Sequence, residues 1–330
     1  MTVAVVILNW NGIELLQQFL PSVVDFSPEA TVYLADNAST DNSVEYVKNN
    51  FTQVKIIQNK INGGYSKGYN DALSGLEEEL FILLNSDVQV TPHWLPPIIE
   101  LFQKNENLGA AQPKIMDFKN PEYFEYAGAA GGFLDKLGYP YCRGRIFNSL
   151  EKDKGQYDDE TNIFWASGAC LTIRSSAFFK IGGLDEDYFA HQEEIDVCWR
   201  LHNFGLKVKY TPKSIVYHVG GATLNHMNPR KTFYNFRNSL YNLLKNLPAS
   251  QLLWILPIRM ILDGVAAIKF LIEGRGKHFL AILNAHISFY KMFPVFIKKR
   301  KKVTGKFASF SKFSVVCSHY FLGIKKFSEM

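Results

Sequence analysis

Two acidic residues follow apolar runs at points where a strand would end. Asp36 directly follows the run 32–35, and Asp87 stands three residues after the run 80–84. In open α/β sheets, ligands bind at the carboxyl ends of buried strands. A carboxylate at such an edge can bind a divalent metal ion or accept a hydrogen bond from a ligand. Asp36 and Asp87 are therefore candidates for one binding site.

A second group of residues with chemical potential lies further along the chain. Glu193 and Glu194 open a predicted helix, and either could take the proton of a hydroxyl group that attacks an electrophilic carbon. Asp196 and Arg200 stand four residues apart, which favours an ion pair on one helix face. His218, in a His-Val-Gly-Gly segment, could coordinate a metal ion or contact a phosphate as a neutral imidazole.

Glycines and amides cluster between these two groups and at the first strand end. Gly63 and Gly64 would let the backbone approach a phosphate or a sugar closely. A glycine-rich turn is weak evidence alone, and its value here comes from its neighbours. The amide side chains in question are Asn9, Asn11, Asn62 and Asn70.

The elements that must position these residues alternate in type over the first hundred residues. Such alternation predicts βαβ units and an α/β fold with a mostly parallel sheet. The glycines and aromatic residues of 105–160 indicate loops and a hairpin. Predicted strands are 3–8, 31–35, 54–58, 80–84 and 207–211, and predicted helices are 12–26, 41–50, 66–76, 92–104 and 193–204.

Charge is distributed unevenly between the body of the chain and its end. Of 36 basic and 31 acidic residues, nine basic residues and one acid fall in 297–330, which leaves 27 and 30 elsewhere. The net charge of +5 therefore belongs to the tail, which favours an anionic surface as partner and disfavours a nucleic-acid groove. Four scattered cysteines without a Cys-x-x-Cys motif disfavour a zinc site and suit a reducing compartment.

The last hundred residues differ in character from the rest. The segments 252–272 and 279–297 are rich in Leu, Ile and Phe, but neither reaches ~18 uninterrupted apolar residues, so interfacial helices are favoured over a membrane span. The basic run 298–302 follows them. We predict two regions, residues 1–228 and residues 229–330, the second helical and bound to a membrane surface. A helical subdomain with a solvated tail is the alternative.

Taken together, the motifs resemble those of family 2 glycosyltransferases, which have the GT-A fold with a Rossmann-like nucleotide-binding sheet. Five motifs occur in the family's order over residues 2–225. They are Asn9-x-Asn11, Asp36-Asn37-x-Ser39-x-Asp41, the amide and glycine segment 62–70, Asn85-Ser86-Asp87 in place of Asp-x-Asp, and the acid cluster followed by His218.

The resemblance implies a role for each matching residue. Asp36 would hydrogen-bond a uracil or thymine ring, and Asp87 with His218 would hold Mn²⁺ or Mg²⁺ against the donor diphosphate. Glu194 would be the catalytic base, with Glu193 as its competitor. Asn85 and Glu194 depart from the family, which has Asp at both positions. The other nucleotide-sugar-binding residues would be Asn9, Asn11, Asn62, Gly63, Gly64, Asn70, Ser86 and Gly168.

The implied activity is inverting transfer of a sugar from a UDP- or dTDP-linked donor to a glycan acceptor. The pattern is similar to rhamnosyltransferase-like members that build bacterial surface polysaccharides, whose acceptors are lipid-linked. Such an enzyme would lie in the cytoplasm, attached peripherally to the inner face of the cell membrane. No prediction of oligomeric state follows.

Two other hypotheses remain open at this stage. A sugar-phosphate nucleotidyltransferase would need a basic glycine-rich signature near the N-terminus, and residues 9–12 contain no basic side chain. A catalytically inactive scaffold at the membrane is motivated by Asn85 in place of an acid. The retention of Asp87, Glu194 and His218 argues against the scaffold.

Overall fold

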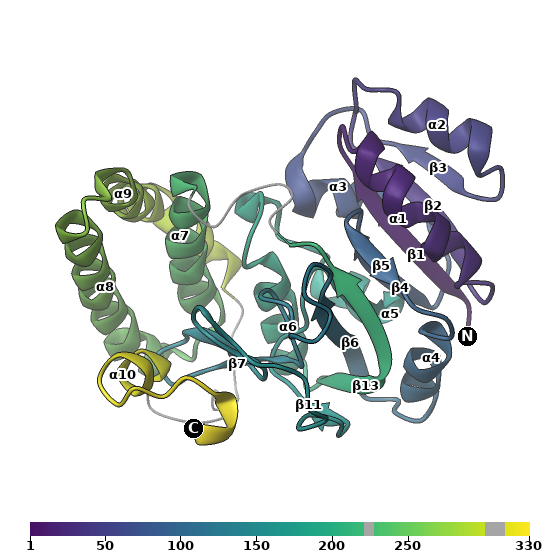
Figure 1. Ribbon diagram of the computed structural model, residues 1–330. Coiled ribbons are helices and arrows are strands. Elements are labelled where there is room, and N and C mark those ends of the chain that lie inside the picture. The colour runs from purple at the N-terminus through teal and green to yellow at the C-terminus, as the bar shows by residue number, and fades with distance from the viewer. Residues whose placement is uncertain (221–227, 301–313) are drawn as a thin grey trace.

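The computed structural model describes residues 1–220, 228–300 and 314–330 of the chain. In this part of the chain nine strands form one twisted sheet, flanked by helices, and a group of long helices packs against one end of it (Figure 1). The strand order is β11-β13-β6-β12-β4-β1-β2-β3, with β5 paired to β13.

The nucleotide-binding half predicted from the sequence is a parallel sheet. β1 (Val3–Asn9) lies between β2 (Thr31–Asp36) and β4 (Leu80–Asn85), and β3 (Lys55–Gln58) pairs with β2. Both faces of β1 and β4 are buried, which is why these strands read as continuous apolar runs. The helices of this half are α1 (Ile13–Asp25), α2 (Ser43–Asn50), α3 (Gly64–Leu73) and α4 (Leu95–Gln103).

Beyond β4 the sheet becomes mixed. β12 (Cys170–Arg174) inserts antiparallel between β4 and β6 (Leu108–Asp117), and β13 (Lys207–His218) pairs in parallel with β6. β13 extends well past the predicted strand 207–211. The short elements here are β5 (Val88–Val90), β11 (Thr161–Asn162), α5 (Ser175–Ile181), the 3-10 turn η1 (Glu186–Tyr188) and α6 (Glu193–Asn203).

The middle of the chain forms the hairpins that its glycines predicted. A small antiparallel sheet has the order β10-β9-β8-β7 and covers the region between the main sheet and the C-terminal helices (Figure 1). Its strands are β7 (Gly132–Leu134), β8 (Pro140–Cys142), β9 (Arg145–Ile146) and β10 (Ser149–Leu150).

The C-terminal helices begin where the composition changes, but they share a hydrophobic core with the sheet. Leu240 and Tyr241 of α7 and Phe296 of α9 belong to the same buried cluster as Tyr188 and Trp199. The change at 228 is therefore one of element type, with no break in the core. The helices are α7 (Pro229–Asn246), α8 (Ala249–Ile272), α9 (Gly276–Lys299) and α10 (Val315–Tyr320), followed by the 3-10 turn η2 (Phe327–Glu329).

Candidate active site

The turns after β1 and β2 are tied together by buried amides. The side-chain nitrogen of Asn9 donates to Asp36 Oδ1 at 3.1 Å, to Ser39 Oγ at 3.1 Å and to Ser43 Oγ at 2.9 Å. Asn9 is fully buried, and Asp36 also accepts from the Ser39 backbone N–H at 3.0 Å. The Asn9 amide nitrogen therefore positions the turn after β2, and the ligand contact expected of Asn9 stays a prediction.

Asn11 performs a similar task at the surface. It is exposed and has φ of +50°, and its Oδ1 accepts from the Thr40 backbone N–H at 2.7 Å. A Cβ atom on Gly12 would lie 2.6 Å from Asn9 Oδ1 and 4.0 Å from Ser86 Oγ. The turns after β1, β2 and β4 therefore meet at one edge, as predicted for Asp36 and Asp87.

The amide and glycine segment forms the wall beside these turns. Asn62 Oδ1 accepts from Asn37 Nδ2 at 2.9 Å and from the Gly64 N–H at 3.0 Å. Gly64 has φ of +77°, and a Cβ there would lie 2.7 Å from the Phe189 carbonyl oxygen, so only glycine fits. Gly63 abuts the Lys67 side chain.

Asn70, whose predicted role as a nucleotide ligand stays a prediction, binds another segment of the chain. Its Nδ2 donates to the Leu184 carbonyl at 2.8 Å, and its Oδ1 accepts from the Leu184 N–H at 2.9 Å. The same nitrogen lies 3.2 Å from Glu186 Oε1. The amide is therefore occupied in fastening the segment that precedes η1 to helix α3.

Asp87 and His218 come together through strand pairing. β5 runs antiparallel to β13 with Val88 opposite His218, and this register places His218 Nε2 3.1 Å from Asp87 Oδ1. Asn85 Nδ2 lies 3.5 Å from the same ring nitrogen. The other ring nitrogen of His218, Nδ1, lies 3.2 Å from Glu125 Oε1. Burial opposes protonation of the imidazole, but Glu125 and Asp87 outweigh it and raise the pKa of His218 to about 10.

This arrangement fits a divalent metal ion that would displace the proton on His218 Nε2, because only a deprotonated nitrogen can coordinate a metal. Adjacent ligands of an octahedral ion bound at ~2.1 Å are roughly 3 Å apart, which matches the separation of the Asp87 and His218 atoms. Glu125 Oε1 lies 3.2 Å from the far nitrogen, and a carboxylate at that nitrogen commonly orients the ring of a metal-binding histidine. The described residues contain no cluster of three or more such ligands, so these two would need ligand oxygens to complete the shell.

Glu193 and Glu194 open α6 and differ in environment. Glu193 is buried with one oxygen unpartnered, and burial together with Glu194 raises its pKa well above the usual value. Glu194 is partly exposed, and desolvation raises its pKa to about 7. A Cβ on Gly168 would lie 3.1 Å from the Tyr65 hydroxyl oxygen and 3.9 Å from Glu194 Cβ. The Tyr65 hydroxyl donates to the Gly168 carbonyl at 2.8 Å, so Gly168 and Tyr65 lie next to Glu194 at the start of α6.

The predicted ion pair of α6 is present but has no place in the site. Arg200 Nη2 lies 2.6 Å from Asp196 Oδ2, and Asp196 is fully buried. Arg200, together with Lys245, holds the pKa of Asp196 well below its usual range despite burial. Asp196 also pairs with Lys245 Nζ of α7 at 3.0 Å, so this acid fastens α6 to α7 and leaves the chemistry to the residues at the start of α6.

Three residues near the site escaped sequence reasoning in part or whole. Glu125 lies in an irregular segment where no periodicity marks it, and only the fold brings it to His218. Asn37 is buried and joins Asn62 to the β2 turn. Lys231, noted only for its proximity in sequence, is partly buried near Glu125, and burial lowers its pKa. Gly221 of the His-Val-Gly-Gly segment lies outside the described residues.

Comparison with known proteins identifies the fold and the family. A solved structure of GalNAc-T7 with UDP, GalNAc and Mn²⁺ has a TM-score of 0.59 at 20% identity and covers 74% of this chain and 47% of that chain. S. aureus TarS 1–349 in complex with UDP-GlcNAc has a TM-score of 0.57 at 13% identity and covers 90% of this chain and 91% of that chain. These likenesses show the GT-A fold.

Sequence comparison extends this to function at the level of the family. An N-acetylglucosaminyl-diphospho-decaprenol L-rhamnosyltransferase of Mycobacterium tuberculosis is 27% identical over 273 residues, covering 77% of this chain and 87% of the relative. The family model described as "Glycosyl transferase family 2" matches residues 4–182, more than half of the chain. The chain therefore belongs to glycosyl transferase family 2 and is a glycosyltransferase.

Proposed function

We propose that this protein is an inverting glycosyltransferase that moves a sugar from a UDP- or dTDP-linked donor to a hydroxyl group of a lipid-linked glycan. The observation that carries this proposal is the partly exposed Glu194, whose pKa is raised to about 7 by desolvation, next to Gly168 and the Tyr65 hydroxyl. The mycobacterial relative is named for a diphospho-decaprenol-linked substrate, which supports a lipid-linked acceptor and a place in cell-surface glycan synthesis.

In the proposed reaction, Glu194 takes the proton of the acceptor hydroxyl as that oxygen attacks the anomeric carbon. The bond from this carbon to the diphosphate oxygen breaks on the opposite face, so the configuration inverts and the nucleoside diphosphate leaves with the electron pair. A base whose pKa lies near the working pH is well matched to such a transfer. Glu193 is buried, and burial together with Glu194 raises its pKa well above the usual value, so it is the weaker candidate.

Asp87 and His218 would hold the Mn²⁺ or Mg²⁺ ion, with Glu125 orienting the imidazole. Such an ion, when bound, neutralises charge on the departing diphosphate. Lys231 adds a positive charge on the same side, since it lies close enough to Glu125 for their charges to interact. Asn85 and Ser86, in the turn before Asp87, would line the diphosphate path.

Asp36 would read the base of the donor. Both of its oxygens accept hydrogen bonds from the chain, but each carboxylate oxygen has a second lone pair that can accept the N3–H of uracil or thymine. Asn11, Asn62 and Gly64 would shape the nucleoside pocket around it through the contacts already described. We further propose that the enzyme works in the cytoplasm, attached peripherally to the inner face of the cell membrane.

The test is a thermal-shift screen of the whole chain against UDP, dTDP, GDP, CDP and ADP, each with Mn²⁺ and with EDTA. Ligands that bind the native state raise the melting temperature by mass action. We expect a Mn²⁺-dependent rise with UDP or dTDP alone. A cooperative melt that no nucleotide shifts would contradict the proposal and favour a scaffold, and a shift with GDP alone would contradict the donor assignment.

A further inference from the structure

Helix α8 carries an apolar stripe on its solvent side. Trp254, Ile258, Ile261, Val265 and Ile268 follow one another at intervals of four, three, four and three residues, which places them on one helix face. Each is between 36% and 67% exposed. A helix on the surface of a water-soluble protein normally shows polar residues on this side.

Two of the three charged residues of α8, Arg259 and Asp263, face the opposite way. Arg259 is 2% exposed and donates to the Leu137 carbonyl at 3.0 Å and to Ser239 Oγ at 2.6 Å. Asp263 is fully buried, with His286 Nε2 of α9 3.2 Å from its Oδ2. These two charges therefore point into the protein and leave the stripe from Trp254 to Ile268 without a charge, whereas the third, Lys269, is exposed just beyond it.

Helix α9 repeats the same polarity. Leu280, Leu283, Ile287 and Tyr290, spaced by three, four and three residues, are between 44% and 61% exposed, whereas His278 is buried. α8 and α9 pack on each other at the end of the molecule away from β3 (Figure 1). Among the described residues, α9 alone is long and apolar enough to span a membrane, yet its inner side packs on α7.

We propose that the outer face of the α8–α9 hairpin docks on an anionic lipid bilayer and lies in its interfacial layer. This deepens the proposed function by naming the surface that brings the site to a lipid-linked acceptor. The exposed positive charge of the hairpin favours an anionic bilayer over a second copy of the chain as its partner, because two copies with the same positive charge would repel each other. The exposed cations are Lys269, Arg275, Lys277, Lys291 and Lys298, against one exposed acid, Glu273.

Two cations of the predicted basic tail are engaged by the protein itself. Lys299 is engaged with Asp185 and Asp187, each at 2.5 Å, and Arg300 donates to the Leu244 and Leu247 carbonyls. These two cations hold the end of α9 on the domain and are not free to attract lipid. Four other basic residues of the predicted tail, 301, 302, 306 and 312, lie outside the described residues.

The test is co-sedimentation of the whole chain with vesicles of phosphatidylcholine alone and of phosphatidylcholine with 30% phosphatidylglycerol. We expect binding to the anionic vesicles and a loss on the order of tenfold or more in the double variant Ile261→Asp, Ile268→Asp. Ile61→Asp, at an isoleucine outside the hairpin that is 60% exposed, is the matched control and should bind like the wild type. Circular dichroism melts verify that each variant folds.

Two results would overturn this proposal. One is undiminished vesicle binding by the folded double variant. The other is a dimer in light scattering that the double variant abolishes, which would assign the face to a second copy. Neither measurement uses donor or acceptor, so this proposal can fail while the proposed transferase activity stands, and the reverse also holds.

A second inference comes from the backbone that leads into α6. Phe189, His191 and Gln192 have φ of +64°, +68° and +73°, a region that non-glycine residues occupy only at an energetic cost. Three such residues within four positions persist only where surrounding contacts fix them. They lie directly before Glu193 and Glu194, so their conformation determines where the proposed base points.

Helix α7 supplies the contacts that fix this segment. Asn238 is fully buried, and its Nδ2 lies 3.2 Å from the Tyr188 carbonyl oxygen, 2.9 Å from that of Ala190 and 2.7 Å from that of His191. One turn further along, Asn242 Nδ2 donates to the Gln192 carbonyl at 3.2 Å. Backbone carbonyls of the segment are thus satisfied by amides of a helix that begins forty residues later.

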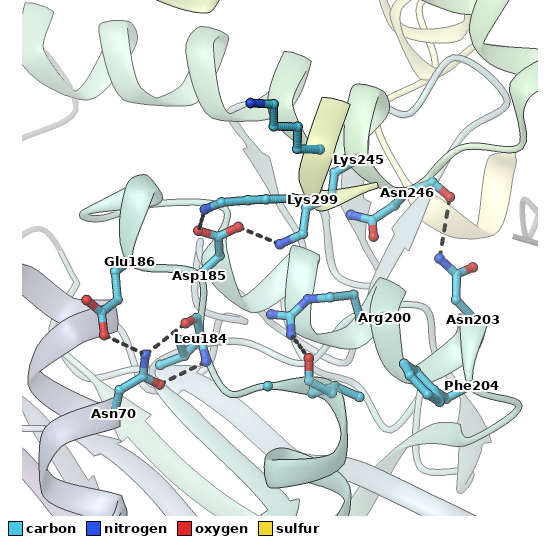
Figure 2. A pocket seen from close by; sticks show the side chains of 13 residues that line it. Asn70, Leu184, Asp185, Glu186, Arg200, Asn203, Phe204, Lys245, Asn246 and Lys299 are labelled. Atoms are coloured by element: carbon cyan, nitrogen blue, oxygen red, sulfur yellow. Dashed lines mark hydrogen bonds and ion pairs between the residues drawn. The ribbon is translucent and has the colours of Figure 1, made fainter. Parts of the chain in front are cut away.

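The same segment also contacts helix α3, which overlaps the amide and glycine segment: the Phe189 carbonyl accepts a hydrogen bond from the Tyr65 N–H at 3.0 Å. The residues just before it are anchored by charge. Figure 2 shows Asp185 between Lys245 and Lys299. The three residues line a pocket of about 710 Å³, and the distances from Asp185 Oδ2 to Lys245 Nζ and from Oδ1 to Lys299 Nζ are 2.6 and 2.5 Å. Helices α7 and α9 therefore hold the segment before and through its strained residues.

We infer that Asn238 is a positioning residue that sets the location and desolvation of Glu194. This inference rests on the proposed function of Glu194 as base. Asn246, on the same helix and 2% exposed, is a suitable control, since its Nδ2 donates to Asp196 Oδ1 at 2.9 Å and it makes no contact with the strained segment. Asn238→Ala and Asn246→Ala each remove one buried amide of α7.

The experiment combines hydrogen exchange with a pH profile. In Asn238→Ala we expect faster exchange of the backbone amide hydrogens in the peptide 186–195. We also expect the acid limb of the pH profile of turnover to move from about pH 7 toward pH 4.5, because water would reach Glu194. Asn246→Ala should lower the melting temperature but keep the wild-type exchange rate of peptide 186–195 and the acid limb near pH 7. Unchanged exchange in Asn238→Ala, or an equal change in both variants, would overturn the inference. Hydrogen exchange needs no substrate, so it decides the inference even if the wild type transfers no sugar.

Discussion

Replacing Glu194 by Gln should abolish sugar transfer while leaving nucleotide binding nearly intact. The carboxylate is expected to act only as proton acceptor, and loss of a general base costs on the order of 10²–10⁴ in kcat. The pKa of about 7 gives a second, quantitative expectation for the wild type. A base with that pKa is about 10% ionised at pH 6 and 90% at pH 8, so turnover should rise roughly tenfold between these pH values.

The assay is release of nucleoside diphosphate from the donor that stabilises the protein, followed from pH 5 to pH 9 at saturating Mn²⁺. Glu193→Gln is the matched control, because it changes the adjacent carboxyl group and should keep the limb near pH 7. Glu194→Asp, which restores the shorter acid seen in the family, should retain partial turnover. Full turnover by Glu194→Gln, or a profile flat from pH 6 to pH 8, would refute the assignment of the base.

Three further predictions concern the surroundings of this base. Glu125→Gln should raise the Mn²⁺ concentration needed for half-maximal turnover on the order of 10–100-fold, because it removes the carboxylate beside the His218 ring. An unchanged Mn²⁺ titration would exclude a role for Glu125 in metal binding. Gly64→Ala should lower both melting temperature and turnover, because its φ of +77° and the nearby Phe189 carbonyl exclude a Cβ; wild-type melting would contradict the geometry. Glu193→Gln should stabilise the protein at pH 8 but hardly at pH 4.5. The raised pKa of Glu193 in the folded protein means that ionising this carboxyl group costs stability as the pH rises, and Gln removes that cost. Equal shifts in melting temperature at both pH values would argue against this explanation.

The architecture of the first hundred residues followed from pattern alone. The predicted strands 3–8, 31–35 and 80–84 agree within one residue with β1, β2 and β4, because parallel strands buried on both faces leave unbroken apolar runs. The helix at 193–204 was predicted equally well. The prediction for β13 ended too early, at residue 211, because Lys213 and Ser214 interrupt the apolar pattern near the irregular pairing of this strand with β6.

The candidate site was predicted as a set of residues but not as a geometry. Asp87 and His218 are 131 positions apart, and the pairing of β5 with β13 alone brings them to 3.1 Å. Glu125 gave no signal, because its segment has neither helical nor strand periodicity. Asn9 and Asn70 have the residue type of ligands, but only the structure shows that their amides are occupied by the chain itself.

The sequence by itself determined the family, the α/β alternation and the identity of the acids at the strand ends, because these depend on residue type and short-range spacing. Tertiary structure decided which of those residues face the site and which fasten it. It also decided the orientation of α8, since the inward direction of Arg259 and Asp263 depends on partners more than twenty residues away. Contacts between distant segments are set by the packing of the whole chain, and no local pattern records them.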